Sequence, residues 1–180
     1  MNLIKEISAL SVDYFEDEEI KNRIKSTYSI ISSMNKVLPD SLLEVKIYNE
    51  SGKILELKEV LLSLRGRYVL IDNCASWCIP CINEIDLANT SAIHEKIKKN
   101  ELEILYLSQD INISKWNAFH LEKKLPVTNS FLFVNVPNHF MIFFMINKIP
   151  RYILIGKNGE LIDYDAPRLS DFDSLVRLLK

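Results

Sequence analysis

Two cysteines separated by two residues, Cys78 and Cys81, are the side chains of this sequence most suited to chemistry. They follow a short apolar run at 68–71 and precede a helical pattern, so they are predicted to lie where a buried strand ends and a helix begins. The unpaired backbone N–H groups and the dipole at the start of a helix stabilise a thiolate. Cys78 is therefore predicted to be an exposed nucleophile with a lowered pKa, and Cys81, one turn further on, to resolve the mixed disulfide.

Pro80 lies between the two cysteines and fits the first helical turn, where its missing N–H costs little and its ring stiffens the chain. The alternatives to a redox pair are a zinc half-site and two core cysteines. A four-ligand zinc site needs a second pair of ligands, and the remaining candidates lack ligand spacing: Cys74, His94, His120 and His139. The pattern favours redox chemistry with no metal and no bound cofactor.

Length and charge narrow the possible partners. The chain has 180 residues, 22 of them basic and 24 acidic, and its net charge of −2 makes nucleic acid an unfavourable partner. No apolar run reaches the roughly 18–20 residues that span a bilayer, so no transmembrane segment is predicted. The first ten residues lack the basic-then-apolar layout of a signal peptide. Either the protein is cytoplasmic or a signal is missing from this sequence.

Strand and helix patterns alternate along the chain, which predicts an α/β fold with a mixed central β-sheet flanked by helices. Helices are expected at 1–38, 57–64, from the cysteines to about residue 99, 114–123 with Ser114 as cap, 138–146, and from Ser170 onward. Strands are expected at 45–47, 54–55, 68–71, 102–107, 131–134, and in a hairpin of 152–155 with 161–164. The composition changes near Pro39, so residues 1–39 are predicted to be a helical N-terminal extension and 40–180 the main domain.

The segment Ala75-Ser76-Trp77-Cys78-Ile79-Pro80-Cys81, placed after a buried strand, resembles the active-site motif of the thioredoxin superfamily. The lead-in at 66–72 and the pair Asn83-Glu84 resemble its TlpA/ResA branch, and residues 149–161 resemble the cis-proline strand and hairpin of the family. The resemblance covers about residues 40–180 and implies a thioredoxin-like fold. It also implies a thiol–disulfide oxidoreductase that acts on protein thiols and disulfides, draws on an upstream electron donor, and works outside the bacterial cytoplasmic membrane, in the periplasm or an equivalent compartment.

The resemblance implies roles for single residues. Pro150 matches the cis-proline, which in this fold brings Ile149 beside Cys78, where its backbone can pair with an extended substrate. Asp72 matches the buried acid of thioredoxin. Its desolvated carboxyl would have a raised pKa and could take the proton of Cys81. The alternatives are an ordinary trans turn at the proline and a strand-end aspartate that caps a turn.

Three further positions complete the predicted site. Glu84 matches an acidic residue near the active site of ResA-type proteins, and its alternative is a solvated helix residue. Trp77 is expected to shield the disulfide and, with Ile79 and Pro80, to contact partners. The alternative for Trp77 is plain packing.

Cys74 departs from the family pattern, which has a bulky residue there. It is interpreted as a small buried hydrophobe, with an auxiliary thiol that pairs with Cys78 or Cys81 as the alternative. A Cys-x-x-x-Cys pair also resembles copper-delivery members of the superfamily, for which His139 would be the distal ligand.

The dipeptide Ile79-Pro80 carries no charge and no histidine, which favours a reductase over an oxidase. The alternatives are a disulfide isomerase or oxidase with the same residues, and a non-enzymatic binding module that uses the helical extension and the apolar run at 140–146. That run is predicted to be a fully buried helix, with an exposed groove near the active site as its alternative.

Overall fold

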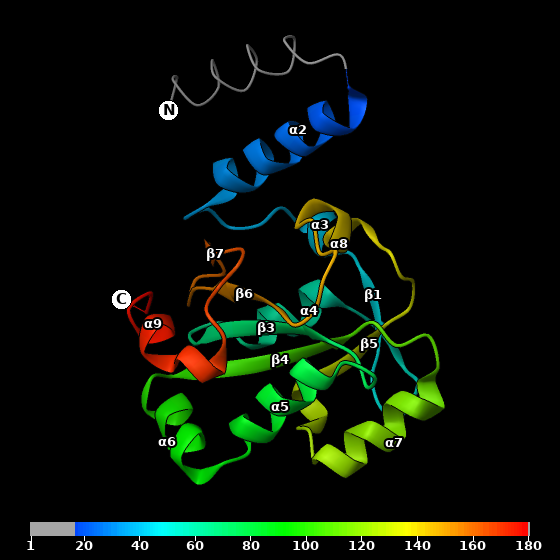
Figure 1. Ribbon diagram of the computed structural model, residues 1–180, viewed down its shortest axis with the longest axis vertical. Coiled ribbons are helices and arrows are strands. Elements are labelled where there is room, and N and C mark those ends of the chain that lie inside the picture. The colour runs from blue at the N-terminus through cyan, green and yellow to red at the C-terminus, as the bar shows by residue number, and fades with distance from the viewer. Residues whose placement is uncertain (1–16, 180) are drawn as a thin grey trace.

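The mixed central sheet expected from the sequence is present in the computed structural model, which describes residues 17–179 (Figure 1). Its seven strands follow the order β2-β1-β5-β4-β3-β6-β7. The strands are β1 (Lys46–Tyr48), β2 (Ile54–Glu56), β3 (Tyr68–Cys74), β4 (Leu102–Ser108), β5 (Ser130–Phe133), β6 (Arg151–Ile155) and β7 (Leu161–Asp163). β3, β4 and β5 run parallel, and each remaining strand is antiparallel to its neighbour.

Helices cover both faces of this sheet (Figure 1). One face carries α5 (Ile79–Ala88), α6 (Ser91–Lys99), α7 (Ile113–Lys123) and α9 (Phe172–Val176); the other carries α2 (Glu18–Ser33), α3 (Asp40–Leu43), α4 (Leu57–Ser63) and α8 (His139–Phe143). Two short 3₁₀ turns, η1 (Val127–Asn129) and η2 (Leu169–Asp171), precede β5 and α9.

β3 is the central strand, and every one of its seven residues is buried. It pairs with β4 on one side and β6 on the other, while helices cover both of its faces. A strand in this position needs apolar residues on both faces, which explains the continuous run Tyr68-Val69-Leu70-Ile71.

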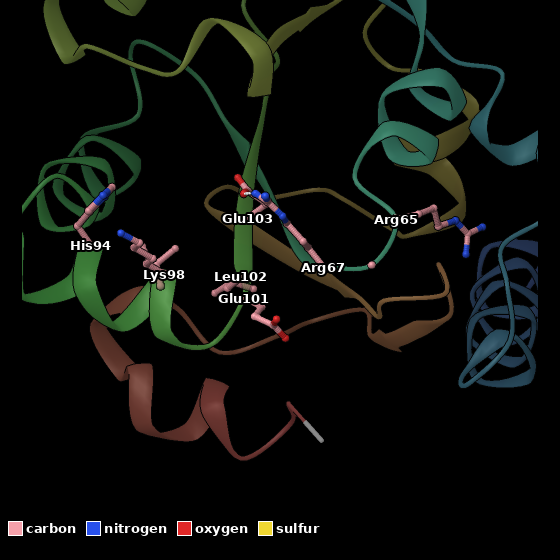
Figure 2. Close-up of a pocket in the computed structure, with 9 residues that line it drawn as sticks. Arg65, Arg67, His94, Lys98, Glu101, Leu102 and Glu103 are labelled. Atoms are coloured by element: carbon pink, nitrogen blue, oxygen red, sulfur yellow. Dashed lines mark hydrogen bonds and ion pairs between the residues drawn. The ribbon is translucent and has the colours of Figure 1, made fainter.

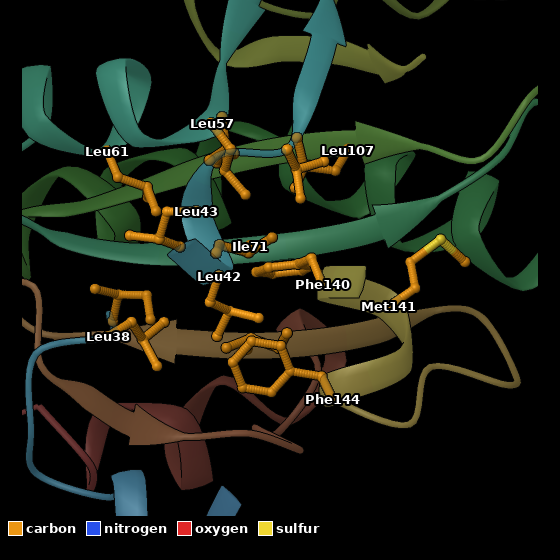
Figure 3. Packing of buried hydrophobic residues seen from close by; sticks show 14 of the residues in the cluster. Leu38, Leu42, Leu43, Leu57, Leu61, Ile71, Leu107, Phe140, Met141 and Phe144 are labelled. Carbon is orange, nitrogen blue, oxygen red and sulfur yellow. The ribbon is translucent and has the colours of Figure 1, made fainter. Parts of the chain in front are cut away.

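The sheet separates two apolar clusters, because successive side chains of a strand point to opposite faces. Leu70 and Cys74 of β3 pack in the cluster on the α5 face, whereas Val69 and Ile71 pack in the other. Figure 3 shows the second cluster, in which Ile71 meets side chains from α3, α4 and α8. The apolar residues of β3 therefore contribute to the core on both faces of the sheet.

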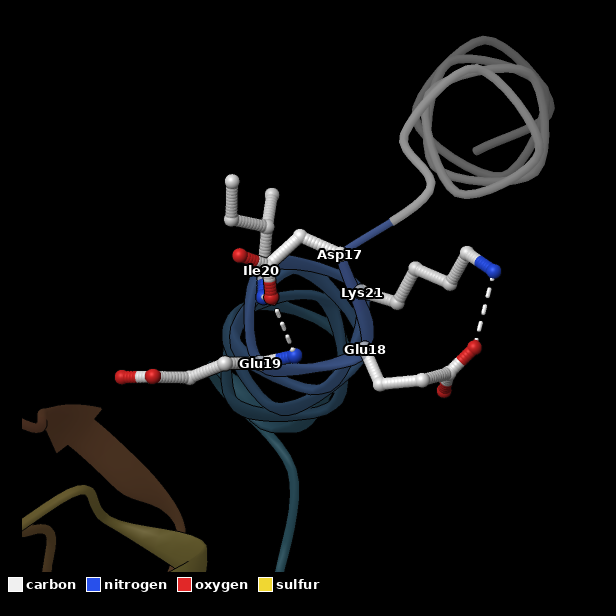
Figure 4. A network of polar contacts seen from close by, with 5 residues as sticks. All are labelled: Asp17, Glu18, Glu19, Ile20 and Lys21. Carbon is white, nitrogen blue, oxygen red and sulfur yellow. Dashed lines mark hydrogen bonds and ion pairs between the residues drawn. The ribbon is translucent and has the colours of Figure 1, made fainter.

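Asp17 caps the amino end of α2 and explains why the helix begins there (Figure 4). Its carboxylate accepts hydrogen bonds from the backbone N–H groups of Glu19 at 2.7 Å and Ile20 at 3.3 Å. Glu18 in the first turn suits the helix dipole and pairs with Lys21 at 2.8 Å.

The predicted helix over 1–38 is shorter at its carboxyl end than expected. α2 stops at Ser33, because Asn35 adopts a positive φ of 57° and the chain then pairs with the β7 hairpin. Residues 1–16 lie outside the described part of the chain. Ile30 of α2 and Leu38 of the following linker are buried in the main core, so residues 17–39 pack on the sheet domain. A domain boundary at Pro39 stays a prediction.

Two other predicted helices were wrong in their bounds, and a third was wrong in its cap. The helix expected up to residue 99 is two helices, since Asn89 ends α5 and Thr90 caps α6. α7 is capped by Asn112, whose side chain accepts the Lys115 N–H at 3.0 Å, and not by Ser114. The expected helix at 138–146 is the five-residue α8.

The run at 140–146 is not fully buried, contrary to expectation. Phe140 and Phe144 are fully buried, but Ile142, on the opposite side of the short helix α8, is 63% exposed. Among the described residues, no helix has the length and apolar content needed to cross a membrane.

Ile30 and Ile31 offer a matched test of the packing of α2, since the first is fully buried and the second is 40% exposed. We expect Ile30→Ala to lower the free energy of unfolding by about 2–5 kcal/mol, because it leaves a cavity in the core. Ile31→Ala should cost less than about 1 kcal/mol. Urea denaturation measures both. Equal small effects would contradict the packing of α2 on the sheet domain.

Candidate redox site

Cys78 and Cys81 form a disulfide at the amino end of α5, with their Cα atoms 5.2 Å apart. Cys78 is the N-cap of the helix, and its Sγ accepts a hydrogen bond from the backbone N–H of Cys81 at 3.2 Å. Pro80 occupies the first turn, where no intrahelical donor is lost. The sulfur of Cys78 therefore caps the helix and belongs to the redox pair at the same time.

Cys78 is the more accessible of the two cysteines, as predicted, but it is more buried than expected. Cys78 is 5% exposed and Cys81 is fully buried, so the prediction of an exposed Cys78 is wrong for the disulfide form. The reason is that the Cys78 sulfur is turned toward Cys81 and the first turn of α5, inside the apolar cluster against which Ile149 packs. Trp77 and Ile79 beside it are 67% and 70% exposed.

Asp72 lies in β3, two residues before Cys74, and is fully buried. Burial raises the pKa of its carboxyl to about 8, with a smaller opposing effect from the Tyr152 hydroxyl and a small raising effect from the charge of Glu84. Tyr152 donates to Oδ2 at 3.4 Å, while Oδ1 has no hydrogen-bond partner in the described part of the chain. The burial and raised pKa expected from the sequence are both found, and the free oxygen leaves Asp72 able to exchange a proton.

Glu84 is only 6% exposed, which rules out the alternative of a solvated helix residue. Its carboxylate accepts two hydrogen bonds from Ser170 of η2, one from the backbone N–H at 3.0 Å and one from the hydroxyl at 2.6 Å. These contacts tie α5 to the segment before α9, so in this state both of its oxygens are engaged.

Pro150 lies immediately before β6, and the Ile149–Pro150 peptide bond is cis. Arg151, the next residue, is paired with Asn73 of β3, and the Asn73 side chain donates to the Arg151 carbonyl at 3.1 Å. By this register Pro150 is level with Cys74, the last residue of β3. The structure thus brings the segment before β6 to the same end of β3 as the disulfide.

Asp110 is a site residue that the sequence analysis missed. It follows the end of β4 and is 4% exposed. Its carboxylate accepts hydrogen bonds from the Ser76 N–H at 2.8 Å, the Ser76 hydroxyl at 2.7 Å and the Ser108 hydroxyl at 2.6 Å. The available signal was its place shortly after the strand expected at 102–107, because the carboxyl ends of parallel strands in a sheet meet at one edge. Ile111 beside it is 95% exposed and was missed as well.

Cys74 is fully buried and has no disulfide partner. Burial raises the pKa of its thiol well above the ordinary value, and the nearby carboxyls of Asp72 and Asp110 raise it further. A thiol in this state is a poor nucleophile, which supports its interpretation as a small buried hydrophobe. His139, its suggested copper-binding partner, is exposed, and residues 17–179 contain no cluster of three metal-ligating side chains.

A surface pocket of about 530 Å³ lies at the amino ends of β3 and β4, opposite the end that carries the disulfide (Figure 2). Its lining includes the ion pair of Arg67 with Glu103, and Glu101 of the lining pairs with Lys157, which lies outside the lining. These pairs balance opposite charges. The pocket and the redox site are therefore separate features of the fold.

Comparison with known proteins finds relatives by structure alone. No protein-family model matches the sequence, and no curated protein matches it. A thiol–disulfide oxidoreductase from Bacteroides fragilis is 25% identical, with a TM-score of 0.56 over 74% of this chain and 96% of the other. The solution structure of a Bacteroides vulgatus protein, named provisionally as a thiol–disulfide oxidoreductase, is 27% identical, with a TM-score of 0.61 over 74% and 83%.

A third structure extends the match over more of the chain. The thioredoxin domain of a thiol–disulfide oxidoreductase from Bacteroides vulgatus is 19% identical, with a TM-score of 0.63 over 82% of this chain and 98% of that domain. The chain therefore has the thioredoxin-like fold, as the resemblance implied.

The raised pKa of Asp72 makes stability depend on pH. The folded protein keeps this proton up to about pH 8, whereas the unfolded chain loses it near the ordinary aspartate pKa of 3.8. Between these values the folded state binds more protons, so the free energy of unfolding falls as pH rises, by on the order of 4 kcal/mol between about pH 5 and pH 9. Asp72→Asn should remove this decline.

Urea denaturation of the oxidised protein at the two pH values measures it. Asp173→Asn, at a position whose side chain is 89% exposed, is the control and should keep the wild-type slope. An unchanged slope in Asp72→Asn would show that the Asp72 carboxyl ionises normally.

Proposed function

We propose that this thioredoxin-like chain is a TlpA/ResA-type thiol–disulfide oxidoreductase that exchanges electrons with protein disulfides through Cys78 and Cys81. The observation that carries the proposal is the Cys78–Cys81 disulfide, in which the sulfur of Cys78 caps α5. A thiolate released at that sulfur would meet the N–H of Cys81 and the positive end of the helix dipole. This makes Cys78 the better nucleophile of the pair.

Reduction of a partner then takes two exchanges. The Cys78 thiolate attacks one sulfur of the partner disulfide, forming a mixed disulfide and releasing the other partner sulfur as a thiolate. The Cys81 thiol next loses its proton and attacks the Cys78 sulfur, which closes the Cys78–Cys81 disulfide and releases the second partner thiolate. Two electrons pass from the cysteine pair to the partner.

Asp72 is proposed to hold the proton that this cycle moves. Its carboxyl lies on the same face of β3 as Cys74, which packs in one cluster with Cys78 and Cys81. In the disulfide form the pKa of about 8 keeps the carboxyl protonated near neutral pH. When a donor dithiol opens the disulfide, this proton can pass to the leaving Cys81 thiolate, and the carboxylate can take it back when Cys81 resolves the next mixed disulfide.

Glu84 is a second candidate for this proton transfer, after Asp72. Both of its oxygens accept hydrogen bonds from Ser170, which hold this carboxylate toward η2. Its negative charge acts on Asp72 and contributes to the raised pKa of that carboxyl. We therefore assign Glu84 to the tuning of Asp72.

The partner surface is proposed to be the apolar rim of the disulfide. Trp77 and Ile79 flank Cys78 and are 67% and 70% exposed, although burial would suit such side chains better. The hydrogen bonds of Asp110 to Ser76 place Ile111, 95% exposed, next to this loop. An extended partner could pair with the backbone of Ile149 beside Pro150 while its apolar side chains cover the rim.

Reduction is the proposed direction. Ile79 and Pro80 supply no charge to stabilise a thiolate, and the carboxylates of Glu84 and Asp110 lie at the same end of the sheet. Negative charge disfavours a nearby thiolate, which makes the disulfide harder to reduce and the dithiol a better reductant. From the TlpA/ResA resemblance we propose that the activity lies outside the bacterial cytoplasmic membrane and that an upstream electron donor supplies it.

Trapping of the mixed disulfide tests the proposed roles of the two cysteines. With insulin as substrate and dithiothreitol as donor, Cys78→Ser should abolish catalysed disulfide reduction. Pre-reduced Cys81→Ser, mixed with insulin after the dithiothreitol has been removed, should accumulate a mixed disulfide at Cys78, because the resolving thiol is missing. Non-reducing gels and mass spectrometry detect the adduct.

Cys74→Ser is the matched control and should keep the rate within about twofold, because the Cys74 thiol is buried and protonated. Partner binding that survives the double substitution Cys78→Ser, Cys81→Ser, with no reduction by the wild-type protein, would overturn the enzymatic proposal in favour of a binding module.

The redox potential of the pair tests the direction separately. Equilibration with glutathione or dithiothreitol buffers should give a two-electron couple near that of thioredoxin, about −270 mV. A value near that of DsbA, about −120 mV, would point to an oxidase or isomerase with the same residues.

A further inference from the structure

We propose that Asp110 is a positioning residue of the redox site, and that it keeps Cys78 within reach of Cys81 while their disulfide is open. The inference rests on the proposed function and adds to it a residue that lies outside the Cys-Ile-Pro-Cys motif. The inference gives Asp110 a part in the resolving step, in which the Cys81 thiolate attacks the sulfur of Cys78.

The contacts form a tether between β4 and the loop that carries Cys78. Asp110 accepts both the N–H and the hydroxyl of Ser76, at 2.8 and 2.7 Å, and only Trp77 separates Ser76 from Cys78. Behind the carboxylate, Ser108 donates its hydroxyl at 2.6 Å and accepts the Asp110 N–H at 3.0 Å. The tether is thus anchored in the last residue of a buried central strand.

The neighbouring backbone extends the same connection. The N–H of Gln109 donates to the carbonyl of Cys74 at 2.9 Å, and the N–H of Cys78 donates to the carbonyl of Ala75 at 3.1 Å. The chain from β3 to α5 is therefore held to β4 at Cys74 and Ser76. Apart from the Ser76 contacts, three things hold Cys78 in position: its N–H bond to the Ala75 carbonyl, its place as the N-cap of α5, and the disulfide itself.

Opening the disulfide removes one of these constraints and leaves the tether. If the loop is held in the same place in both redox forms, the dithiol keeps a high effective concentration of one cysteine at the other. A high effective concentration favours ring closure and lowers the redox potential of the pair. Loss of the tether frees the loop only in the dithiol form, so it should raise the potential and slow ring closure.

Burial makes the tether strong enough to matter. Asp110 is 4% exposed, and in the described part of the chain its side-chain hydrogen bonds come from serine hydroxyls and a backbone N–H. Hydrogen bonds to a charged group contribute more to stability than those between neutral groups. Removal of the Ser76 hydroxyl takes away one such bond without changing the charge of the site.

Ser76→Ala is the decisive variant, and Ser76→Thr is its matched control, because threonine keeps the hydroxyl. We expect Ser76→Ala to raise the equilibrium constant for reduction of the pair by glutathione about fivefold, which corresponds to ~20 mV. The mixed disulfide of the wild-type cysteines with insulin should persist about fivefold longer in Ser76→Ala. Ser76→Thr should restore both values to within about twofold of wild type.

Asp110→Asn supplies the second measurement. If Ser76 acts through this carboxylate, Ser76→Ala should change the potential less in the Asp110→Asn background than in the wild type. A purely structural contact would give a different result: Ser76→Ala would lower the free energy of unfolding equally in the disulfide and dithiol forms and leave the potential unchanged. That result would overturn the assignment.

The outcomes separate this inference from the proposed function. A wild-type protein without a reversible Cys78–Cys81 couple would overturn both. A normal couple, with the potential and the mixed-disulfide lifetime unaffected by Ser76→Ala, would overturn the role of Asp110 and leave the oxidoreductase proposal intact.

Discussion

The burial of β3 on both faces and along both edges is the constraint on which the redox site depends. β3 pairs with β4 over all seven of its residues and with β6 over five, so its end has one position in the fold. The position of the residues that directly follow β3 is therefore fixed as well. The disulfide, the start of α5 and the buried carboxyl of Asp72 are all placed by this one strand.

Neighbouring strands then bring distant parts of the chain to the same edge. β4 supplies Asp110, which contacts Ser76, and β6 brings Pro150 level with Cys74. From the other direction, α5 presents Glu84 to Ser170 near the end of the chain. The site is thus assembled from five separate segments, and its buried carboxylates, Asp72, Glu84 and Asp110, accept hydrogen bonds from neutral donors. Such contacts fix geometry while adding no positive charge that would favour a thiolate.

The sequence was sufficient where the signal is local. The cysteine spacing, the apolar run at 68–71 and Pro80 predicted the strand, the helix start and the cysteine pair, because each depends on residues a few positions apart. Burial of Cys78, the break after Asn89 and the contacts of Asp110 depend on tertiary packing, which no short pattern encodes. Asp110 looks like a loop aspartate until its strand is placed beside β3. Ile142 is exposed because α8 is short. The run of seven apolar residues led us to overestimate the length of this helix and the share of it that is buried.

The linker after α2 also determines how the sheet ends. Asn35 donates its N–H to the carbonyl of Leu161 at 2.7 Å, and Leu161 donates to the carbonyl of Lys36 at 2.9 Å, so the start of β7 is paired with the linker. An uncovered edge strand is a template for pairing with other chains, and proteins protect such edges with loops or charges. Residues 34–37 therefore protect this edge of the sheet against pairing with other chains, a role unrelated to sulfur chemistry.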